Sequence, residues 1–266
     1  MDALYTLILV IALLLSVAAG WWVRGRMHER YLATASIDSV RLLMGMLLTF
    51  SALVLGLLTS NAKQRFDGLN DNLSSFGTDL IELDHRLRTY GSDADPIRTL
   101  LRRYTASAIA NSWPSETRPS GPLALFPPSP PASGLEGKQL GDILNQVDLE
   151  IERLEPNDDL HQHLGARLRD RIAAVMEQRW KLIFAARSTI AWPFLLTLTT
   201  WLSIIFAIFG MTSPPGRVVY AVAALSALSI ASPLYLILDY SDALSGTIAL
   251  SSAPMRAALA HMDAEQ

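Results

Sequence analysis

Four stretches of this chain contain no charged side chain and are long enough to cross a lipid bilayer as helices. They occupy residues 3–23, 42–62, 188–216 and 218–238. A helix needs about 20 apolar residues to cross the hydrocarbon core, because each residue adds about 1.5 Å. We therefore expect membrane spans at residues 3–23, 42–62, 190–210 and 218–238. The pattern predicts a multi-pass protein surrounded by the lipid bilayer and excludes an ordinary soluble enzyme.

The charged residues are concentrated between the second and third spans. Of the 47 Asp, Glu, Lys and Arg residues, 34 lie within residues 63–187. This predicts an all-α protein with a first transmembrane hairpin (1–62), a helical extramembrane region (63–189), a second transmembrane hairpin (190–238) and a C-terminal tail (239–266). An even number of spans places both termini and the extramembrane region on the same side.

A seam of apolar residues predicts one unusually long helix. Its spacing alternates between three and four residues, a period of 3.5, in this series: Phe66, Leu69, Leu73, Phe76, Leu80, Leu83, Leu87 and Tyr90. The same register continues backwards through Ala62, Thr59, Leu55, Ala52, Leu48 and Gly45 into the second span. We expect a single helix over about residues 40–90, ended by Gly91 and Ser92.

Further helices follow in the extramembrane region and the tail. Asp95 and Pro96 provide an N-cap and a first-turn proline for a helix that runs to about residue 111. Residues 113–134 hold 7 of the 14 prolines and predict a proline-rich loop. Helices are expected at 140–154 and 160–189, separated by a capping break at 156–159. Ser252 and Pro254 predict the start of a short helix in the tail.

The chain lacks the motifs of known catalytic and metal sites. It has no cysteine, no glycine-rich phosphate loop and no Gly-x-Ser-x-Gly motif. His161 and His163 are two residues apart, whereas a metal pair on a helix needs a spacing of three or four. The net charge of −3 comes without a basic stripe for nucleic acid. We therefore predict no catalytic residue, no metal, no cofactor, no nucleic-acid partner and no enzymatic activity.

The second span contains the strongest candidates for function. No ionisable residue lies in the middle of any span, which disfavours a proton-coupled transporter or a voltage sensor but allows a pore. The candidate pore-lining or helix-packing residues are Gly45, Leu48, Ser51, Ala52, Leu55, Gly56 and Thr59. Small residues four apart let helices approach closely, so packing is the favoured interpretation. The candidate charges at the pore mouths are Arg41, Lys63, Arg65, Asp239 and Asp242.

Several segments resemble one family of bacterial membrane proteins. They are residues 41–46 (RLLMGM), 52–58 (ALVLGLL), 60–63 (SNAK), 83–86 (LDHR), 90–91 (YG), 100–103 (LLRR), 206–210 (FAIFG) and 251–256 (SSAPMR). The chain is similar to the bacterial bestrophin-like family of four-span proteins, a family whose activity is not established. The name implies a fold relation to bestrophins, which are pentameric anion channels with two membrane hairpins and a helical cytosolic region.

The resemblance transfers no individual functional residue. The family pattern has Arg-Pro-aromatic before Ser-Gly after the fourth span, whereas Asp242, Ala243 and Leu244 precede Ser245 and Gly246 here. A role tied to that arginine is therefore not carried over. The second span also lacks a bestrophin neck motif, so no selectivity-filter residue is assigned.

Two hypotheses about function follow from these patterns. The leading one is a homo-oligomeric ion channel in the bacterial inner membrane, for small inorganic ions and above all anions. The alternative is a non-conducting membrane scaffold or sensor whose soluble helices bind a partner.

The side on which the extramembrane region lies is left open by the charges that flank the spans. Five basic residues lie near the short-loop ends of the spans, and five near the other ends. The positive-inside rule gives weight to short loops, which favours cytoplasmic short loops. The bestrophin analogy favours a cytoplasmic extramembrane region, and we adopt the analogy.

Overall fold

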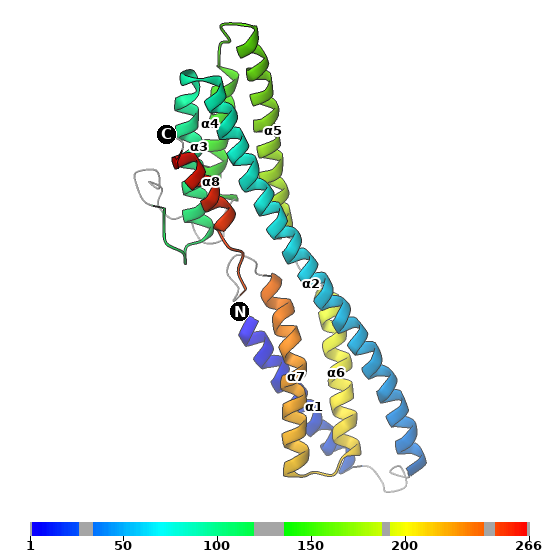
Figure 1. Ribbon diagram of the computed structural model, residues 1–266. Helices are drawn as coiled ribbons and strands as arrows, with labels where there is room; N and C mark the ends of the chain where they lie inside the picture. The colour runs from blue at the N-terminus through cyan, green and yellow to red at the C-terminus, as the bar shows by residue number, and fades with distance from the viewer. Residues whose placement is uncertain (1, 27–33, 120–135, 188–191, 242–247, 265–266) are drawn as a thin grey trace. The chain divides into compact units, whose positions relative to one another are not determined.

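The computed structural model describes residues 2–26, 34–119, 136–187, 192–241 and 248–264. All regular structure in these ranges is helical and none of it is strand, as the sequence predicts (Figure 1). The helices are α1 (Asp2–Arg24), α2 (Thr34–Tyr90), η2 (Ser92–Ala94), α3 (Asp95–Ser112), α4 (Lys138–Glu152), α5 (Asp159–Arg187), α6 (Trp192–Thr212), α7 (Arg217–Ser241) and α8 (Ala253–Ala264).

Four of these helices are long and apolar enough to cross a membrane. The segments are Leu4–Arg24, Asp38–Tyr90, Trp192–Thr212 and Arg217–Tyr240. Each contains or overlaps one predicted span. The number and positions of the apolar helices are therefore confirmed.

Helix α2 has 57 residues and is the longest element of the fold. The prediction of one helix over residues 40–90 is confirmed, and its first turns begin six residues earlier, at Thr34. Gly91 follows with a φ of 113°, a left-handed conformation that glycine adopts without steric cost. This residue ends the helix where the sequence predicts.

The start of α3 differs from the prediction in one detail. The N-cap residue is Ala94, which follows the short helix η2, and no side chain caps this end. Asp95 is instead the first residue of the helix, and its carboxylate lies 3.8 Å from Arg98. The prediction of Asp95 as the N-cap is therefore wrong, because the turn of 3-10 helix before α3 supplies the cap position. Pro96 does lie in the first turn.

The break before α5 is capped as predicted. The Asp158 carboxylate accepts a hydrogen bond from the backbone N–H of His161 at 2.7 Å. This contact satisfies one of the amides that the first turn of a helix leaves without a partner. Of the predicted proline-rich loop, residues 120–134 lie outside the described residues.

The chain divides into two compact units. Residues 1–64 and 189–242 form the membrane unit, and residues 65–188 and 243–266 form the helical unit. In the membrane unit, α1 packs against both α6 and α7. Its core includes the fully buried residues Leu13, Val17 and Leu198. These contacts join α1 to the second pair of spans, and a pairing of α1 with α2 as a hairpin stays a prediction.

The helical unit has a larger core that gathers side chains from α2, α3, α4, α5 and α8. Helix α8 packs against α3, with Met255 and Met262 fully buried. The indole N–H of Trp113 donates to the carbonyl of Leu250 at 2.6 Å. The sequence predicted a short helix after Ser252 but not that it would join this core.

The period-3.5 seam of α2 is buried at one end and open at the other. Leu73, Phe76, Leu80, Leu83 and Leu87 are at most 1% exposed in the helical unit. Gly45, Leu48 and Ala52 of the same seam are exposed in the membrane unit. A repeat of 3.5 residues drifts by about 20° per heptad on a straight α-helix, so the seam turns by roughly 80° between Leu73 and Gly45.

Candidate functional site

The membrane-spanning part of α2 presents three chemically different faces. The inner face packs on the rest of the membrane unit and includes Ser51, Val54, Leu58 and Ala62. Ser51 and Ala62 are only 2% and 5% exposed. The Ser51 hydroxyl donates to the carbonyl of Leu47 at 2.8 Å, so its polarity is satisfied within its own helix.

A second face, called here the small-residue face, consists of Gly45, Thr49, Ala52, Gly56 and Ser60. All five residues are exposed within one protomer. At 3.6 residues per turn their Cα atoms lie in a sector of about 80°. A Cβ atom added at Gly45 or Gly56 would meet nothing within 4 Å. No other part of the described protomer therefore covers this face.

The third face carries large apolar side chains and is called here the large apolar face. It consists of Leu43, Met46, Phe50, Leu53 and Leu57, each more than half exposed. Its centre is rotated by about 100° from that of the small-residue face. Side chains of this kind suit contact with lipid tails or with the apolar surface of another protomer.

The predicted pore-lining or packing residues are divided among these faces. Gly45, Ala52 and Gly56 belong to the small-residue face, and Leu48 lies at its edge with 46% exposure. In contrast, Ser51 faces inward. Leu55 and Thr59 are half-buried, and the Thr59 hydroxyl donates to the Leu55 carbonyl at 2.8 Å.

The predicted mouth charges have different surroundings. Arg41 is exposed and lies 3.6 Å from Asp38. Lys63 and Arg65 are exposed at the other end of the apolar segment. Asp239 is only 1% exposed, so it does not face open water within one protomer. Asp242 lies outside the described residues.

Comparison with known proteins places this architecture in one family. A family model named for the bestrophin-like domain matches residues 10–255. The chain belongs to the bestrophin-like family. No protein among the curated sequences matches it.

The same architecture occurs in solved structures of bacterial bestrophin homologues. One mutant of a homologue from Klebsiella pneumoniae has a TM-score of 0.68 and 15% identity, over 98% of this chain and 97% of that chain. Another mutant from the same organism has a TM-score of 0.61 and 17% identity, over 99% and 98%. At this identity the likeness shows the fold. Together with the four apolar helices and the family membership, it locates this bestrophin-like protein in a membrane.

A close crossing of α1 and α6 in this bestrophin-like protein was not predicted from the sequence. A Cβ atom built at Gly20 of α1 would lie 2.1 Å from the carbonyl oxygen of Ala207 in α6. One built at Gly210 would lie 2.2 Å from the carbonyl oxygen of Val17. Only glycine allows backbones to approach this closely. The spacing of Ser16 and Gly20, four residues apart, was the available signal.

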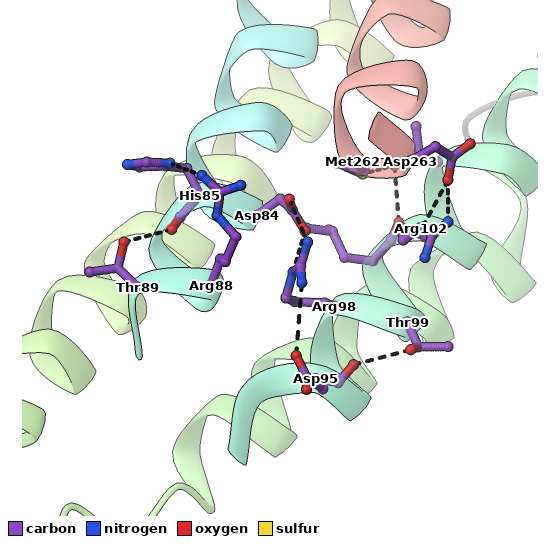
Figure 2. A network of polar contacts seen from close by, with 12 residues as sticks. Asp84, His85, Arg88, Thr89, Asp95, Arg98, Thr99, Arg102, Met262 and Asp263 are labelled. Carbon is purple, nitrogen blue, oxygen red and sulfur yellow. Dashed lines mark hydrogen bonds and ion pairs between the residues drawn. The ribbon is translucent and has the colours of Figure 1, made fainter. Parts of the chain in front are cut away.

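Ion pairs tie the helices of the helical unit together (Figure 2). Asp84 of α2 accepts hydrogen bonds from Arg98 of α3 at 3.0 and 3.3 Å. Their side chains are only 5% and 13% exposed. Arg102 of α3 pairs with Asp263 of α8. The buried, hydrogen-bonded Asp84–Arg98 pair fixes α3 against α2, and the more exposed Arg102–Asp263 pair adds a contact between α3 and α8.

A second polar cluster joins the segment after α3 to the start of α8. The Glu116 carboxylate accepts hydrogen bonds from the Ser252 hydroxyl and, at 3.0 Å, from the Arg256 Nε–H. The hydrogen bond from Ser252 is the main cause that lowers the pKa of Glu116, and Arg256 adds to it. This cluster and the Arg102–Asp263 pair hold both ends of α8.

The core of the helical unit contains one deeply buried tyrosine. Tyr104 is fully buried and packs edge-on against Phe76, with ring centroids 6.3 Å apart. Burial raises the pKa of Tyr104 to about 12, and the nearby Arg179 partly opposes this rise. No group of three or more metal-binding side chains occurs within the described ranges.

Proposed function

We propose that this protein is a homo-oligomeric ion channel of the bacterial inner membrane and that the small-residue face of α2 lines its pore. One observation carries the proposal. In an apolar stretch of 18 residues in α2, only 6% of the residues are buried, compared with 17%, 33% and 28% in the corresponding stretches of α1, α6 and α7. Helix α2 is therefore the span whose surface is left for partners outside its own protomer.

The chemistry of the two open faces of α2 supports an oligomer. One protomer supplies four spans, too few to enclose a wide pore. In a ring of protomers, the large apolar face would contact lipid or a neighbour, and the small-residue face would point to the centre. Gly45, Ala52 and Gly56 leave space for water, while Thr49 and Ser60 carry hydroxyl groups. The resemblance to bestrophins, which are pentameric, supports a ring of several protomers.

The charges at the two ends of this face support a modest preference for anions. Arg41 lies one turn before Gly45, and Lys63 follows Ser60 by three residues. Both are exposed, and no charged residue lies between them on the face. Asp67, one turn after Lys63, limits the preference. Salt screens exposed charges over about 8–10 Å, so the preference should decrease as ionic strength rises.

The orientation belongs to the same proposal. By analogy with bestrophins, we place both termini and the extramembrane region 63–189 in the cytoplasm. A C-terminal reporter that is active only in the periplasm should therefore stay inactive. An active reporter would reverse the orientation without affecting the channel proposal.

Three adjacent residues allow a direct test of the pore face, because the chain has no cysteine of its own. Ser51, Ala52 and Leu53 point to the inner, small-residue and large apolar faces. Each is replaced by cysteine in the full-length protein in liposomes. A charged, water-soluble thiol reagent should modify Ala52→Cys and reduce ion flux. It should leave Ser51→Cys and Leu53→Cys unmodified. Modification of Leu53→Cys alone would contradict the assigned pore face.

Ion flux itself is measured in liposomes with opposing chloride and potassium gradients. A reversal potential displaced towards that of chloride is expected. A potential near that of potassium would keep the channel but refute the anion preference. No flux above background from verified oligomers would refute the channel and favour the scaffold, for which the exposed, stacked pair Trp180 and Phe184 is a candidate contact.

A further inference from the structure

A basic hollow lies between α2 and α5 in the helical unit. Two adjacent cavities, of about 350 and 240 Å³, share Arg86 and Arg167 in their walls. The larger cavity is completed by Asp170 and Arg171, and the smaller by Glu82, His85, Thr89 and Leu164. Three guanidinium groups from two helices therefore border one continuous region of the surface.

Ion pairs hold two of the three arginines in place. One carboxylate oxygen of Glu82 accepts hydrogen bonds from Arg86 at 2.6 and 3.1 Å. The other oxygen pairs with Arg171, which also lies 3.3 Å from Asp79. Glu82 thus connects the two arginines, and its two hydrogen bonds from Arg86 orient that guanidinium group. An arginine held in this way loses less freedom when it binds a ligand.

The third arginine is available for a ligand. Arg167 is exposed and forms no hydrogen bond or ion pair within the residues that the structure describes. The neighbouring Asp170 is the only acidic wall residue besides Glu82 in the two cavities. Of the three guanidinium groups, that of Arg167 is the one without an ion pair. An anion that bridges Arg86 and Arg167 would therefore bind a charge that is not already compensated.

We propose that this hollow binds a small phosphorylated molecule, with its phosphate bridging Arg86 and Arg167. Guanidinium groups match the geometry of phosphate oxygens, and a phosphate monoester carries a charge of about −1.5 to −2 at neutral pH. The smaller cavity, with Leu164, Thr89 and His85, takes the remainder of the molecule. Leu164 offers apolar contact there, and Thr89 and His85 offer polar groups.

We expect the ligand to be a free molecule and not a bilayer lipid, because both arginines are far along the chain from the predicted membrane spans. Arg86 follows the end of the second predicted span by 24 residues, and Arg167 precedes the third by 23. This proposal does not depend on the channel, since binding to the helical unit is measured without ion flux.

Binding is measured by titration calorimetry on the full-length protein in a detergent without phosphate groups. The probes are adenosine monophosphate, inorganic phosphate and succinate, a dicarboxylate of similar charge. Saturable binding of adenosine monophosphate is expected, with weaker binding of phosphate. Succinate binding tighter than that of both would overturn the assignment to phosphate. No saturable binding of any probe would overturn the site.

Variants then locate the bound probe. Arg167→Gln should weaken adenosine monophosphate binding by about tenfold or more, because it removes a charge-assisted contact. Arg167→Lys keeps the charge but not the planar fork and should bind with intermediate strength. The matched control is Arg153→Gln, an exposed arginine on the segment after α4 that pairs with Glu150 outside the hollow. Equal weakening by the control, or none by Arg167→Gln, would refute this location.

Discussion

The two halves of α2 belong to one helix and share one seam, yet they bury it to very different degrees. In the helical unit, Leu73, Phe76 and Leu80 are covered by helices of their own chain. In the membrane unit, only the inner face of α2 is covered, and two faces remain open. The half of α2 in the helical unit is packed into a core by its own chain. The half in the membrane unit has surface left for lipid, water or another protomer. A function that needs several copies is therefore sought in the membrane half.

The largest expected effect compares two phenylalanines on this helix. Phe76 is fully buried in the helical unit, whereas Phe50 is 53% exposed in the membrane unit. Phe76→Ala should lower the free energy of unfolding by about 4 kcal/mol, through lost apolar burial and the cavity left behind. Phe50→Ala should lower it by less than about 1 kcal/mol. Denaturant unfolding in detergent measures both. A large loss at Phe50 would show that the large apolar face is buried in an assembly.

The second comparison uses two glycines of the membrane unit. Gly20→Ala should cost about 3 kcal/mol, since the new Cβ would overlap the Ala207 carbonyl and push α1 away from α6. Gly56→Ala should leave protomer stability nearly unchanged, because the added methyl group meets nothing within 4 Å. Thermal unfolding in detergent distinguishes the two. If Gly56→Ala is as damaging as Gly20→Ala, the small-residue face is a close helix contact and not a pore wall.

The third prediction tests whether water is excluded from the core of the helical unit around Tyr104. The pKa of Tyr104 is raised from 10.0 to about 12 in the folded protein. The unfolded chain therefore loses this proton first, and stability should fall by about 2 kcal/mol as pH rises from 10 to 12. Tyr104→Phe should remove this part of the alkaline loss. Unfolding measured from pH 9 to 12 provides the test, and an unchanged pH profile in the variant would show that water reaches the core beside Phe76.

The smallest effect concerns the far end of the helical half of α2, where Tyr90 contacts His161 of α5. The ring centroids are 5.1 Å apart. The hydrogen bond between Asp158 and His161 is the first cause that raises the pKa of His161, with the charges of Asp158 and Asp93 adding to it. His161 in turn lowers the pKa of Asp158, mainly through the hydrogen bond that its backbone N–H donates to the Asp158 carboxylate. The two groups therefore support each other while Asp158 is ionised and His161 is protonated.

The sign of each shift defines a pH window. The stabilisation that Asp158 contributes is present above its ordinary pKa of 3.8 and is lost as pH falls through its lowered pKa. That of His161 is present below 6.5 and is lost as pH rises through its raised pKa. Hydrogen exchange in the first turn of α5 should thus be slowest between about pH 4 and 6.5, after correction for intrinsic rates. Asp158→Asn should abolish the window, and a window that persists in this variant would refute the cap as its cause.

Part of the fold followed from the sequence because its signals are local. The lack of charge over about 20 residues predicted each membrane helix, and Gly91 after the long seam predicted the end of α2. The sequence predicted the candidate pore face only in part. Gly45, Ala52 and Gly56 share an open face, but Ser51 faces inward although it is adjacent to Ala52 in the sequence. A seam of period 3.5 drifts against the 3.6 residues per turn of an α-helix, so residues that share the seam along the whole of α2 do not share one face.

The sequence by itself determined the helical class, the four apolar helices and the length of α2. Hydropathy and periodicity are properties of neighbouring residues and need no knowledge of partners. Only the tertiary structure decided which face of α2 remains open, that α1 crosses α6 at Gly20 and Gly210, and that α8 joins the core of the helical unit. These features depend on contacts such as Gly20 with Ala207 and Trp113 with Leu250. Such pairs are far apart in the chain, and no local pattern specifies which helices will meet.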